Sequence, residues 1–216
     1  MTDVLIRHYD VRDRAAIRHI CCETADRGKP VEPFFHDREL FADLLTSYYT
    51  DYEPQSAWVA ECSGQVIGYV TGCLDSQRYR RITAWRIVPK AMWDVAQRGS
   101  LWSAPSVRLL WAGFQTWLRG GFRIRHFLRD YPAHLHINLQ EGFRGQQVGR
   151  QLLERFVEQV RDAGRPGVHA SVRGDNPASC RFFERVGFSE VSRRSVTLPV
   201  NESYTIRDTI VYGKRC

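Results

Sequence analysis

The chain has 216 residues, of which 43% are hydrophobic and 25% are charged, and its net charge is +7. These values are ordinary for a soluble globular protein, and the length allows one large domain or one domain with an insertion. The six cysteines have the spacing of neither a disulfide framework nor a metal site, and the N-terminus has no apolar signal segment. We therefore predict reduced thiols, no bound metal and a cytoplasmic location. The basic charge suits an anionic cofactor, a nucleic acid, an acidic membrane surface, or simply a solvated surface rich in arginine.

The first third of the chain alternates strand and helix patterns. A short strand is predicted at residues 4–8, and the acidic pair Asp10 and Asp13 favours the start of a helix there. A loop is predicted at 26–33, followed by a second helix from about Asp37. Strands at 57–62 and 66–74 are joined by Ser63-Gly64-Gln65, which is typical of a tight hairpin.

Residues 76–132 carry an aromatic and arginine-rich pattern that is mostly helical. A basic cluster interleaved with Tyr79 and Trp85 opens this segment, formed by Arg78, Arg80, Arg81 and Arg86. Residues 101–118 are almost long enough to span a bilayer, but Pro105, Arg108 and Gln115 favour an amphipathic helix. Such a helix can lie on a membrane, line a substrate pocket or form a dimer contact, and we favour packing over the cleft. Nucleic-acid binding is a further alternative, although no known module is present.

A strand, a turn and a helix follow from residue 134. In His134–Leu139 the residues Leu135, Ile137 and Leu139 fall on one face with period two. The small-residue turn at 140–147 leads into an apolar helical stripe formed by Val148, Leu152, Leu153, Phe156, Val157 and Val160. A turn that opens a helix presents unpaired backbone N–H groups and a positive dipole end, so we predict a phosphate site there.

The last part of the chain reads as strand, helix and two strands. Residues 167–173 alternate, with His169, Ser171 and Arg173 on the face opposite Val168. Asn176 is suited to cap a helix that begins at Pro177 and stops at Gly187. Residues 188–198 and 204–212 are predicted to form a final antiparallel pair.

Two blocks in this half resemble motifs of one family. Residues 144–149, Arg-Gly-Gln-Gln-Val-Gly, resemble the pyrophosphate loop Q/R-x-x-G-x-G/A of the GNAT (Gcn5-related) N-acetyltransferases, and residues 175–188 resemble the next helix and turn of that family. The resemblance covers 134–191 well and implies an α/β (α+β) fold, with a mixed, mostly antiparallel sheet flanked by helices and splayed between strands at 134–140 and 167–173. We expect one GNAT-like domain over 1–216 with an insertion at about 76–132.

The resemblance also implies a site for acetyl-CoA. Leu139 and its neighbours are expected to contact the pantetheine arm, the loop to hold the diphosphate, and Asn176 to bond the cofactor from the opposite wall. The expected cofactor-binding residues are Leu139, Gln140, Arg144, Gly145, Gln146, Gln147, Val148, Gly149, Arg150, Asn176 and Phe183. The helices near the N-terminus border the acceptor side in this family, which makes Phe34, Phe35, His36 and Tyr49 pocket candidates or core residues.

The sequence departs from the family pattern at two positions. Gln147 replaces a glycine, and it costs little if the turn is already helical at that point. Phe183 stands where many members have a tyrosine that protonates the departing thiolate, and phenylalanine has no proton to give. His136 is the predicted general base, because imidazole has a suitable pKa, and the alternatives are Glu141, Asp75 and Asp130.

These observations support two functions. The first is transfer of an acetyl group from acetyl-CoA to an unknown amine acceptor by direct attack in a ternary complex, where proximity supplies most of the catalysis. The second is acetyl-CoA binding without transfer, as a pseudo-enzyme or interaction module. Residues His134–Leu139 and Gly167–His169 resemble the acetyltransferase-like domain of some O-GlcNAc hydrolases and its bacterial relatives, a group often suspected of being non-catalytic. A homodimer is compatible with either function, whereas nucleic acid and membrane are not the expected partners.

Overall fold

The computed structural model describes residues 3–32, 37–97, 127–200 and 203–216. Its strands are β1 (Val4–His8), β2 (Ala57–Cys62), β3 (Gln65–Cys73), β4 (Ala133–Leu139), β5 (Gly167–Arg173), β6 (Ser189–Val200) and β7 (Ser203–Arg215). Its helices are α1 (Arg14–Glu23), α2 (Arg38–Asp51), α3 (Ser76–Ile82), α4 (Val88–Gln97), α6 (Phe127–Asp130), α7 (Val148–Asp162) and α8 (Pro177–Arg185). Short 3-10 turns are η1 (Val11–Asp13), η2 (Pro54–Ser56) and η4 (Glu141–Phe143), and a π-helical segment, η3 (Thr83–Ile87), joins α3 to α4.

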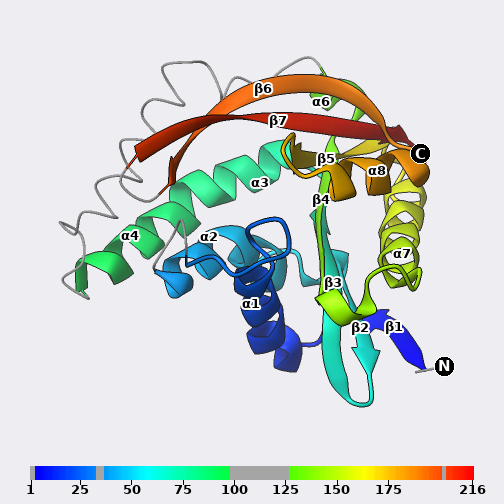
Figure 1. The fold of residues 1–216 in the computed structure, drawn as a ribbon, viewed down its shortest axis with the longest axis horizontal. Helices are drawn as coiled ribbons and strands as arrows, with labels where there is room; N and C mark the ends of the chain where they lie inside the picture. Colours follow the sequence, from blue (N-terminus) through cyan, green and yellow to red (C-terminus); the bar gives the residue numbers. More distant parts are fainter. Residues whose placement is uncertain (1–2, 33–36, 98–126, 201–202) are drawn as a thin grey trace.

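The strands form one mixed sheet in the order β1-β2-β3-β4-β5-β7-β6. Every neighbouring pair in it is antiparallel except β4 with β5, which are parallel. Helix α7 covers one face of the sheet, α1 and α2 lie on the other, and the long β6–β7 hairpin extends beyond the remaining strands (Figure 1). The predicted fold class is therefore confirmed.

Period-two and helical patterns account for the two sides of the sheet. Leu135 points to the α7 side, where it joins the fully buried Leu152, Phe156 and Val160 in the main core. A Cβ on Gly72 of β3 would collide with the Phe156 ring, so this glycine lets α7 pack closely on the sheet. Residues of β4 that alternate with Leu135 face α1 and α2 instead.

Local chemistry sets the element boundaries near where they were predicted. Asp10 and Asp13 form a capping box at the start of η1, Asp37 caps α2 by accepting from the N–H of Leu40, and Ser63-Gly64 makes the β2–β3 turn with both residues at positive φ. The predicted strand at 188–198 begins at Ser189 and continues to Val200. The predicted helix at 101–118 lies outside the described residues.

Candidate active site

The two parallel strands separate part-way along their length. β4 and β5 pair only from Ala133 with Val168 to Leu135 with Ala170, although both strands continue for several residues. Residues 133–135 of β4 are buried, residues 136–140 are half-buried, and Ser171 of β5 is exposed. The predicted splay is present, and solvent reaches it from His136 and Ser171 onward.

The turn after β4 places an uncapped helix start beside this splay. α7 begins at Val148, and no side chain in the described part of the chain caps its N-terminus. Nothing lies within 4 Å of a Cβ built on Gly142 or Gly145, so space is open over the turn. Unpaired N–H groups, the dipole end and open space suit a diphosphate, so the residues present fit acetyl-CoA.

Gln147 has a backbone conformation that the sequence analysis did not expect. It precedes α7 with φ 62° and ψ −1°, in the left-handed region, rather than as part of the helix. The condition for a small cost, a turn that is already helical at this point, is therefore not met, and a Cβ is strained in this region whereas glycine is not.

Two arginines of the turn contact protein groups in this structure. The Arg144 guanidinium donates from Nε and Nη2 to the carbonyl oxygen of Leu139, at 3.1 and 3.0 Å. Arg150 donates to Glu154 at 2.7 Å along the exposed face of α7. Binding of a diphosphate by either guanidinium would therefore exchange these contacts for phosphate oxygens.

The α1–α2 loop lies across the open ends of the splayed strands. Arg173, the last residue of β5, forms an ion pair with Asp26 at 2.7 Å and a second with Asp175 at 2.9 Å. Gly28 adopts φ +88°, and a Cβ on it would collide with the Arg144 guanidinium from the β4 side. The loop is therefore held at both strand ends, at contacts far apart in the sequence that local patterns do not predict.

α8 packs beside the start of α7 and shares its core. Asn176 caps α8 by accepting from the N–H of Ser179 at 3.2 Å, which leaves its amide N–H₂ for a ligand. Phe183 is only 5% exposed and packs against Phe188 and Tyr212, with ring centroids 5.2 and 6.0 Å away. Phe183 thus belongs to the core, whereas the half-buried Phe182 is its neighbour that faces Gly149 at the start of α7.

A polar network covers the face of β4 toward α1 and α2. Ser76 Oγ donates to the carbonyl of Pro132 at 2.7 Å, so it accepts from His134 Nδ1–H at 2.9 Å. His134 Nε2 then accepts from the hydroxyl of Tyr49 at 2.7 Å. Burial lowers the pKa of His134 well below its usual value, with smaller contributions from His169 and His136, and so keeps it neutral.

The predicted base lies on this same face. His136 is half-buried and stands edge-on to Tyr49, with ring centroids 5.7 Å apart. Burial lowers the pKa of His136 to about 4, so its imidazole is neutral at neutral pH but is a weaker base than the free imidazole on which the prediction rested. Asn138, two residues on, donates to the hydroxyl of Tyr69 at 2.7 Å.

The other predicted candidates have structural contacts or lie apart. Tyr49 is fully buried. Asp75 caps α3, Asp130 lies 3.9 Å from Arg215, and Glu141 is exposed in η4. Phe34, Phe35 and His36 lie outside the described residues. The alternation in 167–173 puts His169 on the face opposite Val168, and the centroid of its ring lies 5.6 Å from that of His134.

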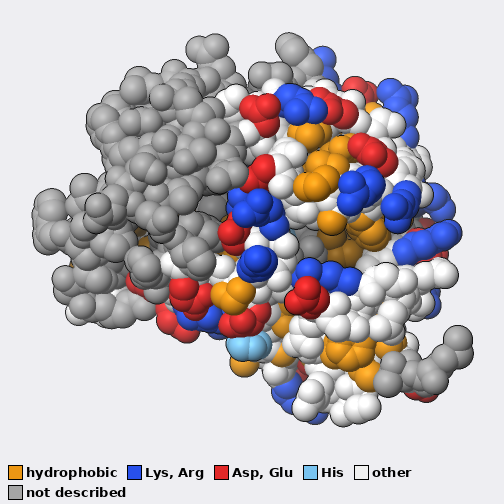
Figure 2. Space-filling view, viewed as in Figure 1, with side chains coloured by type: hydrophobic (Ala, Val, Ile, Leu, Met, Phe, Trp, Pro, Cys, Tyr) orange, Lys and Arg blue, Asp and Glu red, His pale blue; other side chains and the backbone are white. Residues whose placement is uncertain are grey.

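Other surfaces offer less specific chemistry. On the described part of the face in Figure 2, basic and acidic side chains are interspersed rather than gathered into one basic surface. None of the helices that can be described is long and apolar enough to cross a membrane. Among the described residues, no group of three or more histidine, cysteine, aspartate or glutamate side chains could hold a metal ion.

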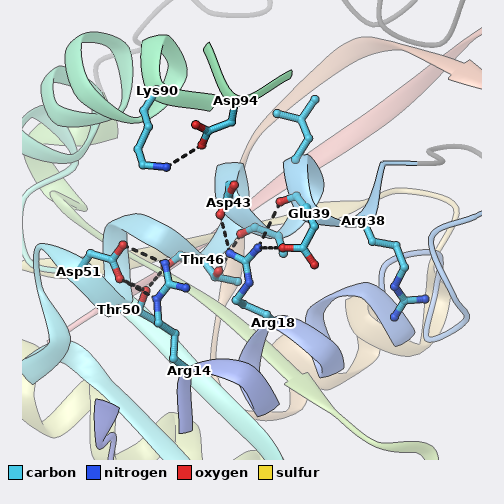
Figure 3. A network of polar contacts seen from close by, with 12 residues as sticks. Arg14, Arg18, Arg38, Glu39, Asp43, Thr46, Thr50, Asp51, Lys90 and Asp94 are labelled. Carbon is cyan, nitrogen blue, oxygen red and sulfur yellow. Dashed lines mark hydrogen bonds and ion pairs between the residues drawn. The ribbon is translucent and has the colours of Figure 1, made fainter. Parts of the chain in front are cut away.

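An open groove of about 490 Å³ lies between α1 and α2, with Arg14, Arg18 and Arg38 among its lining residues. Figure 3 shows the network along it, in which Arg14 pairs with Asp51 and Arg18 pairs with Asp43 and Glu39. Carboxylates already neutralise these guanidinium groups. The ion pairs therefore hold α1 and α2 together, and the groove does not present free positive charge.

The mixed sheet whose parallel strands open beside an uncapped helix start is a GNAT-like fold. Residues 118–188 match the model of the acetyltransferase (GNAT) family. The match covers about a third of the chain, and this segment is therefore similar to the GNAT acetyltransferases, a family that uses acetyl-CoA.

Two solved structures and one curated protein are similar to this chain. The crystal structure of SsHAT has a TM-score of 0.74 and 25% identity, covering 99% of this chain and 98% of that one. The structure of yncA from Salmonella typhimurium, solved with its cofactor acetyl-CoA, has a TM-score of 0.58 and 16% identity, covering 99% and 94%. Mycothiol acetyltransferase of Nocardiopsis dassonvillei is 38% identical over 53 residues, which are 24% of this chain and only 16% of that protein.

Proposed function

We propose that the protein transfers the acetyl group of acetyl-CoA to an amine acceptor by direct attack in a ternary complex. The observation that carries this proposal is the opening of β4 from β5 after Leu135, directly beside the uncapped start of α7. Acetyl-CoA supplies an activated acyl group, and the protein's contribution is to hold it extended in the opening near the acceptor.

The residues expected from the family motif take roles in this proposal. Backbone N–H groups from Gly145 to Arg150 bind the diphosphate, and Arg144 leaves the Leu139 carbonyl to join them. The Leu139 carbonyl that Arg144 leaves, the neighbouring Gln140 and the amide of Asn176 contact the rest of the cofactor. His136, on the face of β4 toward α1 and α2 (the acceptor face), is the general base predicted from the sequence.

The same proposal includes the domain organisation, the cellular location and the oligomeric state. We take residues 1–216 as one GNAT-like domain in which 76–132 is an insertion that shapes the acceptor side. We also propose that the protein acts in the cytoplasm and that a homodimer is its oligomeric form. Gel filtration with light scattering measures the last point directly, since a monomeric mass would contradict it.

The first test is binding. Calorimetric titration with acetyl-CoA should give a saturable one-site isotherm. Gln147→Asp should weaken this affinity about tenfold or more, because it adds a negative charge where the diphosphate binds. Gln147→Asn has nearly the same shape without the charge, so we expect its affinity within about threefold of the wild type. Equal affinities for the two variants would contradict the placement of the diphosphate.

The second test is turnover. Release of free CoA should be followed over a panel of small amines, peptide N-termini and lysine peptides. Saturable release with one acceptor class supports acetyl transfer. Failure to bind acetyl-CoA at all would rule out the proposed function.

A second function is favoured by one specific observation. The position of the family's tyrosine holds Phe183, and this ring packs in the core, so it gives the departing thiolate no proton. We propose acetyl-CoA binding without transfer as the alternative, in keeping with the resemblance to the acetyltransferase-like domain of O-GlcNAc hydrolases. Tight binding with no release of CoA over the whole amine panel would favour it.

A further inference from the structure

The three histidines on the acceptor face differ in which ring nitrogen is free. His134 uses both nitrogens: Nδ1 contacts Ser76 Oγ at 2.9 Å and Cys73 Sγ at 3.0 Å, and Nε2 accepts from Tyr49 at 2.7 Å. A ring held in this way cannot take up a proton without losing a hydrogen bond. His134 is therefore part of the framework.

His169 has one nitrogen fixed and one left over. Its Nδ1 lies 2.9 Å from the carbonyl oxygen of Tyr131, and since a carbonyl only accepts, Nδ1 carries the hydrogen. The remaining nitrogen, Nε2, is then a proton acceptor. Contacts with the rings of Phe127 at 5.2 Å and His134 at 5.6 Å hold the imidazole in place. A histidine whose Nδ1–H bonds a backbone carbonyl has a defined tautomer, as a general base requires.

The position of His169 in the sheet brings it to the opening. It pairs with His134 one rung before the last β4–β5 pair, Leu135 with Ala170. The next residue on the same face of β5 is Ser171, which is exposed. The His169 ring is therefore buried, with 9% of the residue exposed, and lies one rung inside the place where the strands separate.

We propose that His169 Nε2 takes the proton from the acceptor amine, an inference that rests on the proposed acetyl transfer. As the amine nitrogen bonds to the acyl carbon and the carbon–sulfur bond breaks, one N–H proton moves to Nε2. The Nδ1–H bond to the Tyr131 carbonyl favours the imidazolium that forms and partly offsets the burial that disfavours it. His169 then returns the proton to the departing sulfur and ends the cycle neutral.

Two features of the site favour this role for His169. His136 is half-buried, but no hydrogen bond within the described residues orients its ring, so its tautomer is not fixed. Phe183 cannot supply the proton that the thiolate needs. A single histidine that accepts and then returns one proton satisfies both requirements.

The first measurement needs no activity. Nitrogen-15 NMR of histidine-labelled protein, assigned with His169→Asn, should show the Nδ1–H tautomer of His169 at neutral pH. A resonance typical of the Nε2–H tautomer would overturn the proposal, because Nε2 would then have no lone pair to offer.

The second measurement separates binding from chemistry. His169→Asn keeps an amide N–H close to the position of Nδ1, so we expect its acetyl-CoA affinity to be within about twofold of the wild type. We expect its turnover to fall by about 100-fold or more. His19→Asn, on the exposed face of α1, is the matched control and should keep wild-type turnover. Partial rescue of His169→Ala by added imidazole would show that the missing group is the ring itself.

Three outcomes count against this role. Turnover of His169→Asn within threefold of the wild type would overturn it, and so would a larger loss in His136→Asn than in His169→Asn. If His169→Asn does not fold, His169→Gln and the imidazole rescue of His169→Ala give the same comparison. If the wild type binds acetyl-CoA but shows no turnover on any amine, both the proposed acetyl transfer and this role of His169 are ruled out. The two outcomes above rule out only the role of His169, so the two kinds of failure can be told apart.

Discussion

Gln147 is the residue at which sequence and backbone conflict. Its φ of 62° lies where glycine is unstrained and where a residue with a Cβ costs about 1–2 kcal/mol. The strain lies beside the turn that is proposed to hold a diphosphate, and strained backbone often persists at such sites. The fold therefore imposes this conformation on a residue that does not favour it.

Replacing this residue with glycine should stabilise the protein. We expect Gln147→Gly to raise the free energy of unfolding by about 0.5–1 kcal/mol, since relief of strain exceeds the backbone entropy that glycine loses. Gln146→Gly is the matched control. Gln146 is not at positive φ and donates to the Gly142 carbonyl at 2.9 Å, so this change should lower stability by about 0.5–1 kcal/mol. Urea unfolding at neutral pH measures both, and a destabilised Gln147→Gly would contradict the argument.

At the scale of elements, α1 and α2 are joined by a row of ion pairs along the groove in Figure 3. Arg18 bridges Asp43 and Glu39, both at 2.5 Å, and its side chain is only 14% exposed. Arg14 pairs with Asp51 at 3.1 Å, with both side chains more than a third exposed. Exposed pairs contribute little, whereas a half-buried carboxylate that loses its partner is costly.

The two arginines should therefore differ in their contribution to stability. We expect Arg18→Met to lower the free energy of unfolding by about 1–2 kcal/mol, and Arg14→Met by less than about 1 kcal/mol. Urea unfolding in low and high salt provides the measurement, and salt should reduce the Arg14 effect more. If the two variants lose the same free energy of unfolding, burial does not determine how much each ion pair contributes to stability.

At the scale of the whole molecule, neutral histidines are buried between the sheet and its α1–α2 layer. Burial lowers the pKa of His136 and of His169 to about 4, and lowers that of His134 well below its usual value. The unfolded chain binds protons at these rings near pH 6.5, whereas the folded chain does not until the pH is much lower. Their contribution to stability is therefore complete above about pH 6.5 and is lost as the pH falls toward 4.

The protein should unfold more easily in mild acid as a result. Each of these histidines adds up to about 1.4 kcal/mol per pH unit to the slope of stability against pH between 6.5 and 4. Urea unfolding at pH 7.5, 6.5, 5.5 and 4.5 should show stability falling over this range, with a shallower slope in His169→Asn. A flat profile from pH 7.5 to 5 would mean that these rings are protonated or solvated in the folded protein.

Short-range chemistry explains how much of the fold could be predicted from the sequence. Alternation in 134–139, the stripe from Val148 to Val160 and the caps at Asp10, Asp37 and Asn176 each act within a few residues, so their elements are found where they were expected. The two motif blocks located the splay and the turn before α7. The backbone of Gln147 was not predictable, because its φ depends on how the turn meets the helix rather than on the residue itself.

By itself, the sequence determined the order of the elements, the sheet that opens between 134–140 and 167–173, and the loop suited to a diphosphate. Only the tertiary structure decided which side chains at this opening are buried and which hydrogen bonds they make. The bond from Tyr49 to His134 joins residues 85 apart, and that from Arg173 to Asp26 joins residues 147 apart. The same packing placed Phe183 in the core and fixed His169 against Tyr131. Periodicity and capping record only what neighbours along the chain do, whereas hydrogen bonds and burial depend on which distant segments the fold brings together.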